Sequence, residues 1–194
     1  MKDEDGTEKR PYRMGARAEA AAATGERILD ATEALFYERS FEEVTLGAIA
    51  ERAGVTVQTV LRRFGDRKGL SRAALLRLAA RVDRKRGSAS PGDVEGAVRV
   101  LVDHYEEVGD GVLRLLAEEQ RRPSLRTLVD MGRDYHREWC ERVFAPALEA
   151  RRGVERERRL GQIVAVTDIY VWKLLRRDRG LSRRQTELAL RELL

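Results

Sequence analysis

The residues with the clearest chemical use lie in a short segment that follows Thr56. Helical periodicity predicts that this segment exposes one face, which carries Val57, Gln58, Leu61, Arg62 and Arg63, with Thr59 at its edge. Glutamine forms two hydrogen bonds with adenine, arginine does so with guanine, and a threonine methyl group contacts thymine. These residue types therefore favour contact with the bases of double-stranded DNA.

The residues before this segment explain why its face would point outward. Thr45 is the predicted N-cap of a short helix, and Ala50 is small enough for a second helix to cross closely. Gly54 supplies the positive φ that a tight turn needs, and Val55 and Val60 fill the angle between the helices. The pattern predicts a helix-turn-helix whose outer helix enters a major groove. An ordinary hairpin of short helices is the alternative.

Positive charge is concentrated in the same part of the chain. The 194 residues include 38 basic and 33 acidic ones, a net charge of +5. Residues 26–51 hold two basic and seven acidic residues, whereas residues 52–86 hold eleven basic and two acidic ones. A local basic excess is expected of a phosphate-binding surface. An arginine-rich exposed helix would give the same composition.

This region resembles the TetR family of bacterial transcriptional regulators. The residues that match at the family's spacing are Arg27-Ile28-Leu29, Leu35-Phe36, Phe41, Thr45, Ile49-Ala50, Gly54-Val55-Thr56, Thr59-Val60, Phe64, Asp66-Arg67 and Leu70. The resemblance implies a DNA-binding domain followed by helices that dimerise and bind a ligand. The DNA contacts expected from the motif are Thr45, Gly47, Thr56, Val57, Gln58, Thr59, Leu61, Arg62, Arg63 and Arg67.

Three positions depart from the family's pattern. Leu61 stands where the family has a tyrosine that holds the DNA backbone, Arg67 where it has a phosphate-binding lysine, and Ser40 where it has a glycine. We hypothesise that Arg62 and Arg63 compensate for Leu61. The substitution Arg62→Ala should then weaken DNA binding by more than the loss of one exposed charge, and an unchanged affinity would count against the hypothesis.

The whole chain is predicted to be all-α, with about nine helices and no strand. Residues 1–23 show no hydrophobic period and are expected to form a flexible arm, so that the first helix begins behind an N-cap at Thr24. The helix-turn-helix domain is expected over residues 24–70. A fourth helix, over residues 67–86, connects it to a helical ligand-binding and dimerisation domain over residues 87–194.

Helix-breaking residues predict several boundaries in the second half. Pro123 is expected to end one helix, Pro146 to kink the next, and Gly180 to close a helix over residues 154–178. Ser182 and Gln185 form a predicted capping box for the last helix.

Composition excludes several classes of protein. The single cysteine, Cys140, excludes an intrachain disulfide framework and a cysteine-rich zinc site, and fits a reducing compartment. The first five residues are too acidic for a signal peptide. The most apolar run, residues 163–175, contains Asp168 and Lys173 and is shorter than the ~20 residues that span a bilayer. We therefore expect a soluble cytoplasmic protein.

That apolar run is instead expected to lie in a dimer interface. A helix that is apolar nearly all round must be buried on two sides, and a second copy of the chain is the simplest cover for one of them. The predicted interface residues are Val164, Val171, Leu175, Leu188 and Leu190. A central helix within a monomer is the alternative.

A small-molecule pocket is predicted between the helices of the second half. Its expected lining is Asp103, His104, Tyr105, Met131, Tyr135, Trp139, Asp168 and Trp172. Each aromatic residue would equally suit an ordinary core, and Asp168 needs an arginine or a backbone donor as partner. His136 and Cys140 are spaced four apart, but two ligands make a weak metal site. We expect no metal and no cofactor.

Three functions are compatible with these patterns. The leading hypothesis is a homodimeric repressor of a near-palindromic DNA operator that a small-molecule effector releases. The second is a DNA-binding regulator without a ligand. The third is a helical enzyme, or a ligand-binding protein without DNA binding, that uses His104, His136 and Cys140. The sequence contains no nucleophile motif, phosphate-binding glycine loop or metal-ligand cluster, so we do not expect an enzyme.

Overall fold

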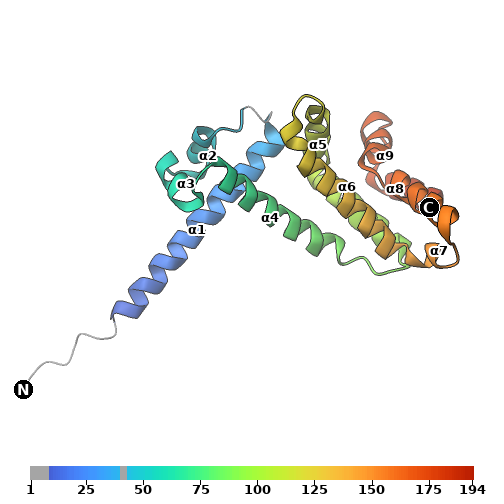
Figure 1. The fold of residues 1–194 in the computed structure, drawn as a ribbon, viewed down its shortest axis with the longest axis horizontal. Helices are drawn as coiled ribbons and strands as arrows, with labels where there is room; N and C mark the ends of the chain where they lie inside the picture. Colours follow the sequence, from blue (N-terminus) through green and yellow to red (C-terminus); the bar gives the residue numbers. More distant parts are fainter. Residues whose placement is uncertain (1–8, 40–42) are drawn as a thin grey trace, which may run out of the picture. The chain divides into compact units, whose positions relative to one another are not determined.

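The computed structural model describes residues 9–39 and 43–194, and these form ten α-helices and one short π-helical segment, with no strand among them (Figure 1). The all-α prediction is confirmed. The chain divides into two compact units, residues 1–78 and residues 79–194, and the boundary falls inside the helix α4, Arg67–Arg86. No helix in the described residues is long and apolar enough to cross a membrane.

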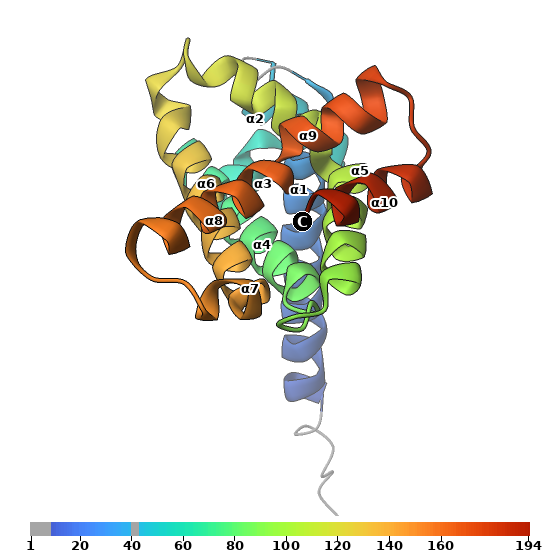
Figure 2. The same ribbon diagram turned by 90° about the vertical axis from the view of Figure 1, so that its right-hand side faces the viewer.

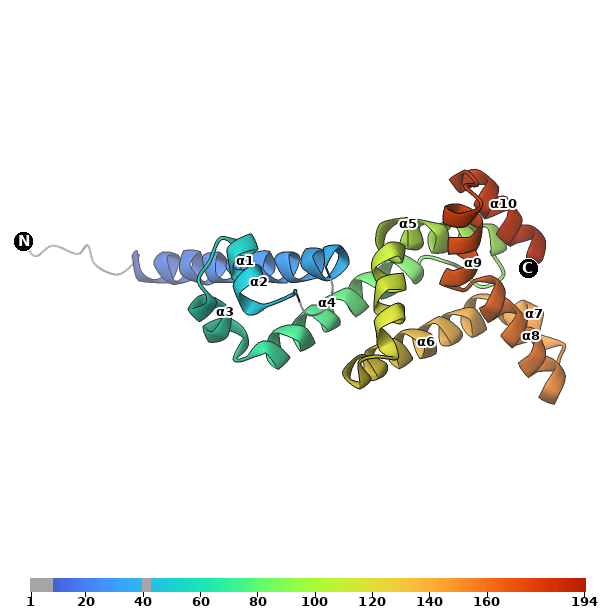
Figure 3. The same cartoon turned by 90° about the horizontal axis from the view of Figure 1, so that it is seen from above.

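The first unit contains α1 (Lys9–Glu38), α2 (Leu46–Ala53), α3 (Val57–Phe64) and the beginning of α4. The short helix α2 crosses the long helix α1 (Figure 3). An apolar core holds the unit together, and its most completely buried side chains are Ile28, Leu35, Ile49, Ala50, Val60 and Leu70. These positions recur at helical spacing in α1 and α2, which is why the sequence pattern identified both helices.

The first helix begins much earlier than expected. It starts at Lys9, and Thr24 lies inside it, where its hydroxyl donates to the carbonyl of Ala20 at 2.8 Å instead of capping a helix end. The alanine-rich stretch before Thr24 has high intrinsic helix propensity, and this outweighs the missing hydrophobic period. Residues 1–8 of the expected arm, together with Ser40 and Phe41, lie outside the described residues.

Ion pairs connect α1 to α4 within the first unit. The guanidinium of Arg77 donates to Glu26 at 2.9 Å, to Asp30 at 2.6 Å and to Glu33 at 2.8 Å. The three carboxylates follow one another along α1 at helical spacing, so one arginine contacts all of them. The Glu33 side chain is only 10% exposed, which makes this contact the least screened of the three.

The second unit contains the end of α4 and all later helices: α5 (Val94–Glu119), α6 (Pro123–Val143), α7 (Ala145–Glu149), α8 (Gly153–Val166), α9 (Ile169–Lys173), the π-helical segment η1 (Leu174–Asp178) and α10 (Arg183–Leu193). The helices α5 and α6 pack together, α8 packs on α6, and α9 and α10 pack on α5 (Figure 2). Trp139 and Trp172 are fully buried in the core between them.

A glycine lets α9 approach α5 closely. A Cβ atom built on Gly109 of α5 would lie 2.6 Å from Cζ3 of Trp172, which is too close for any other residue without movement of the indole. The Trp172 ring therefore rests directly on the α5 backbone, and this contact fixes α9 against α5.

Several predicted helix boundaries need correction. Pro123 begins α6 instead of ending a helix, because a proline at the first helical position loses no hydrogen bond. Pro146 lies in the first turn of the separate helix α7. The helix expected over residues 154–178 is interrupted after Val166, where Asp168 accepts from the amide of Tyr170 at 2.8 Å and starts α9.

Two boundary predictions are confirmed, namely Gly180 after the helical stretch that ends at Asp178 and the capping box of the last helix. Gly180 has φ +68°, which suits its position after η1. Ser182 accepts from the amide of Gln185, and the Gln185 side chain accepts from the amide of Ser182 in return. This is the capping box that the sequence predicts.

Candidate nucleic-acid interface

The turn between α2 and α3 is built from three local interactions. Thr45 caps α2 by accepting from the amide of Ala48 at 3.1 Å, and Thr56 caps α3 by accepting from the amide of Thr59 at 3.2 Å. Gly54 ends α2 with φ +65°, a left-handed conformation that favours glycine. The predicted caps and turn of the helix-turn-helix are thus confirmed.

The inner face of this motif is apolar and closely packed. Ile49, Ala50 and Val60 are each no more than 3% exposed, and Val55 and Phe64 are partly buried against the same core. Because Val60 points inward, the residues before and after it on α3 must face other directions. Packing of this one valine therefore determines which side of α3 faces solvent.

The outer face of α3 is exposed as predicted. Val57, Gln58 and Arg62 are solvent-exposed, while Thr59 and Leu61 are half-buried at the edges. Side-chain hydroxyls of Thr56 and Thr59 lie 3.0 Å apart. The exposed strip thus combines an amide, a guanidinium and a valine methyl surface within two helical turns.

Arg63 is placed differently from Arg62, although the two are adjacent in sequence. A Cβ atom built on Gly25 of α1 would lie 3.0 Å from Nε of Arg63, so the Arg63 guanidinium lies against α1. Arg63 is exposed, but it lies beside the exposed strip and not at its centre. Of the two arginines, Arg62 has the more direct access to a partner at the α3 face.

The other expected contact residues flank α3. Thr45 and Gly47, at the start of α2, are exposed. Arg67, at the start of α4, is also exposed, and its Nη2 donates to the carbonyl of Val44 at 3.1 Å. This hydrogen bond connects the two helix starts. A phosphate approaching either helix N-terminus would meet backbone amides and this guanidinium together.

The exposed charges of α3 and of the first turns of α4 are mostly positive. Arg62, Arg67, Lys68 and Arg72 are all exposed on α3 and on the first turns of α4. The one acidic residue between these helices, Asp66, accepts from the amide of Gly69 at 2.7 Å. A surface of this kind attracts the phosphate backbone and would make binding strongly salt-dependent.

Arg52 does not belong to that positive surface. Its guanidinium forms two hydrogen bonds with Glu38, at 2.6 and 2.7 Å, and these hydrogen bonds lower the pKa of the Glu38 carboxyl. The pair ties α2 to the end of α1. Its charge is therefore largely neutralised within the protein.

Comparison with known proteins identifies this part of the chain. Residues 28–74 match the family model described as bacterial regulatory proteins, tetR family. This segment is thus similar to the tetR family of bacterial regulatory proteins. The match covers α2, α3, the last third of α1 and the start of α4, and it agrees with the resemblance found in the sequence.

Curated relatives are similar to about a third of the chain. The chain is 39% identical over 72 residues to the HTH-type transcriptional regulator AlkX of Mycobacterium tuberculosis. The aligned residues cover 37% of this chain and 32% of AlkX. The chain is 46% identical over 66 residues to the HTH-type transcriptional repressor KstR of Rhodococcus jostii. The aligned residues cover 34% of this chain and 31% of KstR. The matched segment thus spans about a third of each relative.

Solved structures resemble the chain over most of its length. A transcriptional regulator from Rhodococcus sp. RHA1 has a TM-score of 0.65 at 19% identity and covers 87% of this chain and 92% of its own. The regulator SCO7518 of Streptomyces coelicolor has a TM-score of 0.57 at 24% identity and covers 88% of this chain and 97% of its own. The likeness establishes the fold of both units.

The residues predicted to line a pocket are only partly brought together in the second unit. Tyr105, Trp139 and Trp172 are buried in one apolar cluster. His104 is also buried, and its ring lies beside Tyr105. Met131 is 50% exposed and does not belong to that cluster, because its position on α6 faces solvent. Met131 is therefore omitted from the proposed pocket.

The polar ends of these aromatic residues have partners. The hydroxyl of Tyr105 donates to the carbonyl of Thr167 at 3.0 Å, and Nε1 of Trp172 donates to Glu106 at 3.3 Å. The half-buried Tyr135 donates to Asp83 at 3.3 Å. Asp103 is half-buried and pairs with Arg183 at 2.7 Å. Asp168 has the backbone partner that its position in an apolar run requires.

One buried polar residue was missed by the sequence reasoning. Arg86, at the end of α4, is 3% exposed, and its Nη1 lies 3.0 Å from Nδ1 of His136. Its neighbours Arg84 and Lys85 are more exposed, so a run of three basic residues gave no signal that the third is buried. Only the packing of α4 against α6 reveals it.

The histidines of the second unit are held neutral. Burial and the nearby Arg86 lower the pKa of His136 to about 3, and the same two causes lower the pKa of His104 to about 3. Nε2 of His136 lies 3.1 Å from the hydroxyl of Thr167 and 3.7 Å from Sγ of Cys140. No group of three metal-ligating side chains occurs in the part of the chain that the structure describes.

The predicted interface residues fall into two sets. Val164, Val171 and Leu175 are half-buried, and Leu188 is 46% exposed. Leu190 is 1% exposed and packs against Val98 and Val102 of α5 within the same chain. Leu190 is therefore a core residue and is removed from the predicted interface, because the face of α10 that carries it covers α5.

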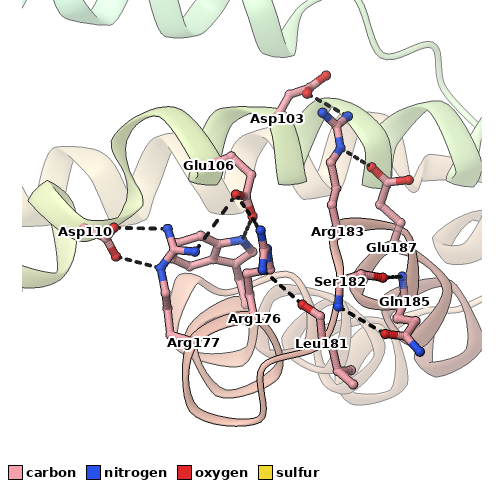
Figure 4. Close-up of polar contacts among 11 residues, drawn as sticks. Asp103, Glu106, Asp110, Arg176, Arg177, Leu181, Ser182, Arg183, Gln185 and Glu187 are labelled. Atoms are coloured by element: carbon pink, nitrogen blue, oxygen red, sulfur yellow. Dashed lines mark hydrogen bonds and ion pairs between the residues drawn. The ribbon is translucent and has the colours of Figure 1, made fainter.

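A set of ion pairs fixes the last elements on α5 (Figure 4). Glu106 accepts from Arg176 at 2.7 Å, and Asp110 accepts from Arg177 at 3.1 and 3.0 Å. The Arg177 guanidinium also lies 4.6 Å from the centroid of the Trp172 ring. These contacts leave the opposite side of α9, η1 and α10 facing solvent.

Proposed function

We propose that the protein is a DNA-binding transcriptional regulator, and that it acts in the cytoplasm as a homodimeric repressor. The observation that carries the proposal is the outer face of α3, where Gln58 and Arg62 are exposed and Val60 anchors the helix from behind. An exposed amide and guanidinium on a helix of this length suit the base edges of a major groove. The match of residues 28–74 to the tetR family model supports the same activity.

Dimerisation is proposed through the solvent-facing side of the last elements. Large apolar side chains are exposed there on α9, η1 and α10: Tyr170, Leu174, Leu188 and Leu193. Their exposed fractions lie between 46% and 56%, and large exposed apolar groups favour a contact that covers them, for which a second copy of the chain is the proposed partner. A two-fold dimer would present two α3 helices to a near-palindromic operator with half-sites about one helical turn apart.

Repression and release by an effector form the finer part of the proposal. The relative KstR is described as a repressor, which supports the same direction of control here. A small molecule bound among the aromatic residues of the second unit would act only if it favoured one separation of the two α3 helices over another. Tyr105, Trp139 and Trp172, with His104 and Tyr135, are the proposed surroundings of that molecule.

The enzyme alternative lacks chemical support. Burial raises the pKa of the Cys140 thiol to about 11, so the thiolate needed for nucleophilic attack is not formed near neutral pH. His136 is engaged by Arg86 and by Thr167 and has no free nitrogen for a substrate. We therefore propose a regulator without catalytic activity.

Selection of bound fragments from random DNA tests the proposal. The purified full-length chain should enrich a sequence with two inverted half-sites. Its affinity for that sequence should fall steeply as salt rises, because every phosphate that the protein neutralises adds about one to the slope of log affinity against log salt concentration. Enrichment of no sequence, together with no binding at low salt, would contradict DNA recognition. Enrichment of a single half-site would contradict the dimer alone.

A further inference from the structure

The buried arginine of the second unit has no counter-ion. Arg86 is 3% exposed, and it forms no ion pair with any carboxylate among the described residues. Its Nη1 donates to Nδ1 of His136, and its Nε is buried without any hydrogen-bond partner in the described chain. A permanently charged group is thus held away from water with at least one donor unused.

The surroundings of Arg86 do not neutralise it. His136 accepts from Arg86 through Nδ1, so its proton lies on Nε2 and is directed to the hydroxyl of Thr167, which in turn donates to the carbonyl of Ile163 at 2.7 Å. This chain of hydrogen bonds is complete with a neutral imidazole. The low pKa of His136 agrees with that neutral state.

Three aromatic rings surround the guanidinium. Its central carbon lies 5.2 Å from the ring of Trp139, 5.6 Å from that of Tyr105 and 5.9 Å from that of Tyr135. Each ring attracts a cation, but the cost of removing a guanidinium from water exceeds what such contacts return. A compensating negative charge is therefore missing from this cluster.

We propose that Arg86 is the anchor of a binding site for an organic carboxylate, which rests on the proposed function because this ligand would be the effector of the regulator. An arginine offers its donors in pairs that match the two oxygens of a carboxylate, and the unused Nε is half of such a pair. The rings of Tyr105, Tyr135 and Trp139 suit an apolar or aromatic body attached to the acid.

The cluster reaches the protein surface at Tyr135. This residue is half-buried, and its hydroxyl bonds to the exposed Asp83 at 3.3 Å. A single hydrogen bond between a half-buried and an exposed side chain is readily broken. Entry of the acid beside Tyr135 would bring its carboxylate to Arg86 while its body stays among the rings.

The test compares acids with their neutral analogues on the purified full-length protein. The probes are benzoate, phenylacetate and the straight-chain carboxylates from acetate to dodecanoate, each beside its primary amide, with binding measured by calorimetry and by thermal shift. We expect at least one acid with an apolar body to bind about tenfold to a hundredfold more tightly than its amide. Equal binding of acid and amide, or no response to any acid, would overturn the proposal.

Two variants of the anchor sharpen this test. Arg86→Met keeps the side-chain length without the charge, so it should fold with an unchanged or raised melting temperature and lose the preference for the acid. Arg86→Lys keeps the charge without the paired donors, so it should lose part of the preference for the acid over the amide. The matched control Arg137→Met, on the exposed side of α6, should respond to the acid as the original chain does.

Three results would contradict the assignment. The first is that Arg86→Met still binds the acid more tightly than the amide. The second is that Arg86→Met has a much lower melting temperature but still responds to the acid as the original chain does. The third is that inorganic phosphate or chloride shifts the melting temperature of the original chain as much as the best acid does. If neither variant folds, the ratio of acid to amide affinity on the original chain decides alone. None of these readouts uses DNA, so failure here is distinct from failure of the proposed DNA binding.

Discussion

The two units of this protein differ in where most of their polar groups of interest lie, although the first unit also buries Thr32 and Glu33. In the first unit Thr45, Thr56 and Asp66 satisfy backbone amides locally at helix starts, and Arg62 of α3 is exposed to solvent. In the second unit Arg86, His104, His136, Thr167 and Thr186 are buried. The first arrangement leaves polar and charged side chains on the surface, where a large partner can contact them. The second encloses such side chains within a helical core, as a binding site for a small ligand would require.

The two units also differ in the interactions that stabilise them. The first unit is small and has a single apolar core, so its stability rests on caps, one turn and the packing of α1 with α2. The second unit rests on two fully buried tryptophans and on a polar cluster between helices far apart in sequence. Substitutions that distinguish these sources of stability test the comparison directly.

The largest expected effect follows removal of the Trp172 side chain. Trp172→Ala should lower the free energy of unfolding of the second unit by about 3 to 5 kcal/mol, because the indole is fully buried against Gly109. Urea unfolding followed by circular dichroism measures this. Val154→Ala, at a position 80% exposed, is the control and should change stability by less than about 0.5 kcal/mol. A similar effect for both would refute the proposed core.

The second-largest expected effect is a loss of stability of the second unit at acidic pH. The chain has two histidines, and both have a pKa near 3 in the folded protein against an ordinary value of 6.5. Below pH 6.5 the two histidines are therefore protonated in the unfolded chain but stay neutral in the folded chain. The free energy of unfolding thus falls as the pH falls. Lowering the pH from 6.5 to 5.5 should cost about 2 kcal/mol for the pair. His136→Gln should remove about half of this dependence, and an unchanged profile would contradict the buried neutral state.

The turn of the first unit should show a smaller effect. Gly54→Ala places a side chain at φ +65°, which costs about 1 kcal/mol after the entropic gain in the unfolded chain is deducted. No atom lies within 4 Å of the new Cβ, so the cost is conformational and not steric. Gly132→Ala, inside α6 with equally open space, should instead stabilise by about 0.5 to 1 kcal/mol. Equal and favourable effects at both sites would contradict the turn.

The sequence predicted the first unit well because its determinants are local. Thr45, Gly54 and Thr56 act within three or four residues, and Val60 follows the helical period. The start of α1 was misjudged because alanine propensity, without any apolar period, extends the helix to Lys9.

Prediction was less complete in the second unit because long-range packing decides there. Burial of Arg86 depends on α4 meeting α6, 50 residues later in the chain, and Leu190 is buried because α10 turns that face to α5. Asp168 interrupts an apolar run, and this signal could have located the break between α8 and α9, because an aspartate readily caps a new helix.

The central claim is that the exposed face of α3 contacts DNA bases. The most direct measurement compares the affinity of Gln58→Ala and of Gln162→Ala, which changes another exposed glutamine, on α8, for the DNA sequence enriched by selection. Gln58→Ala should bind about tenfold more weakly and tolerate base changes at one position of each half-site, while Gln162→Ala should bind as before. Unchanged affinity and unchanged base preference for Gln58→Ala would contradict the claim.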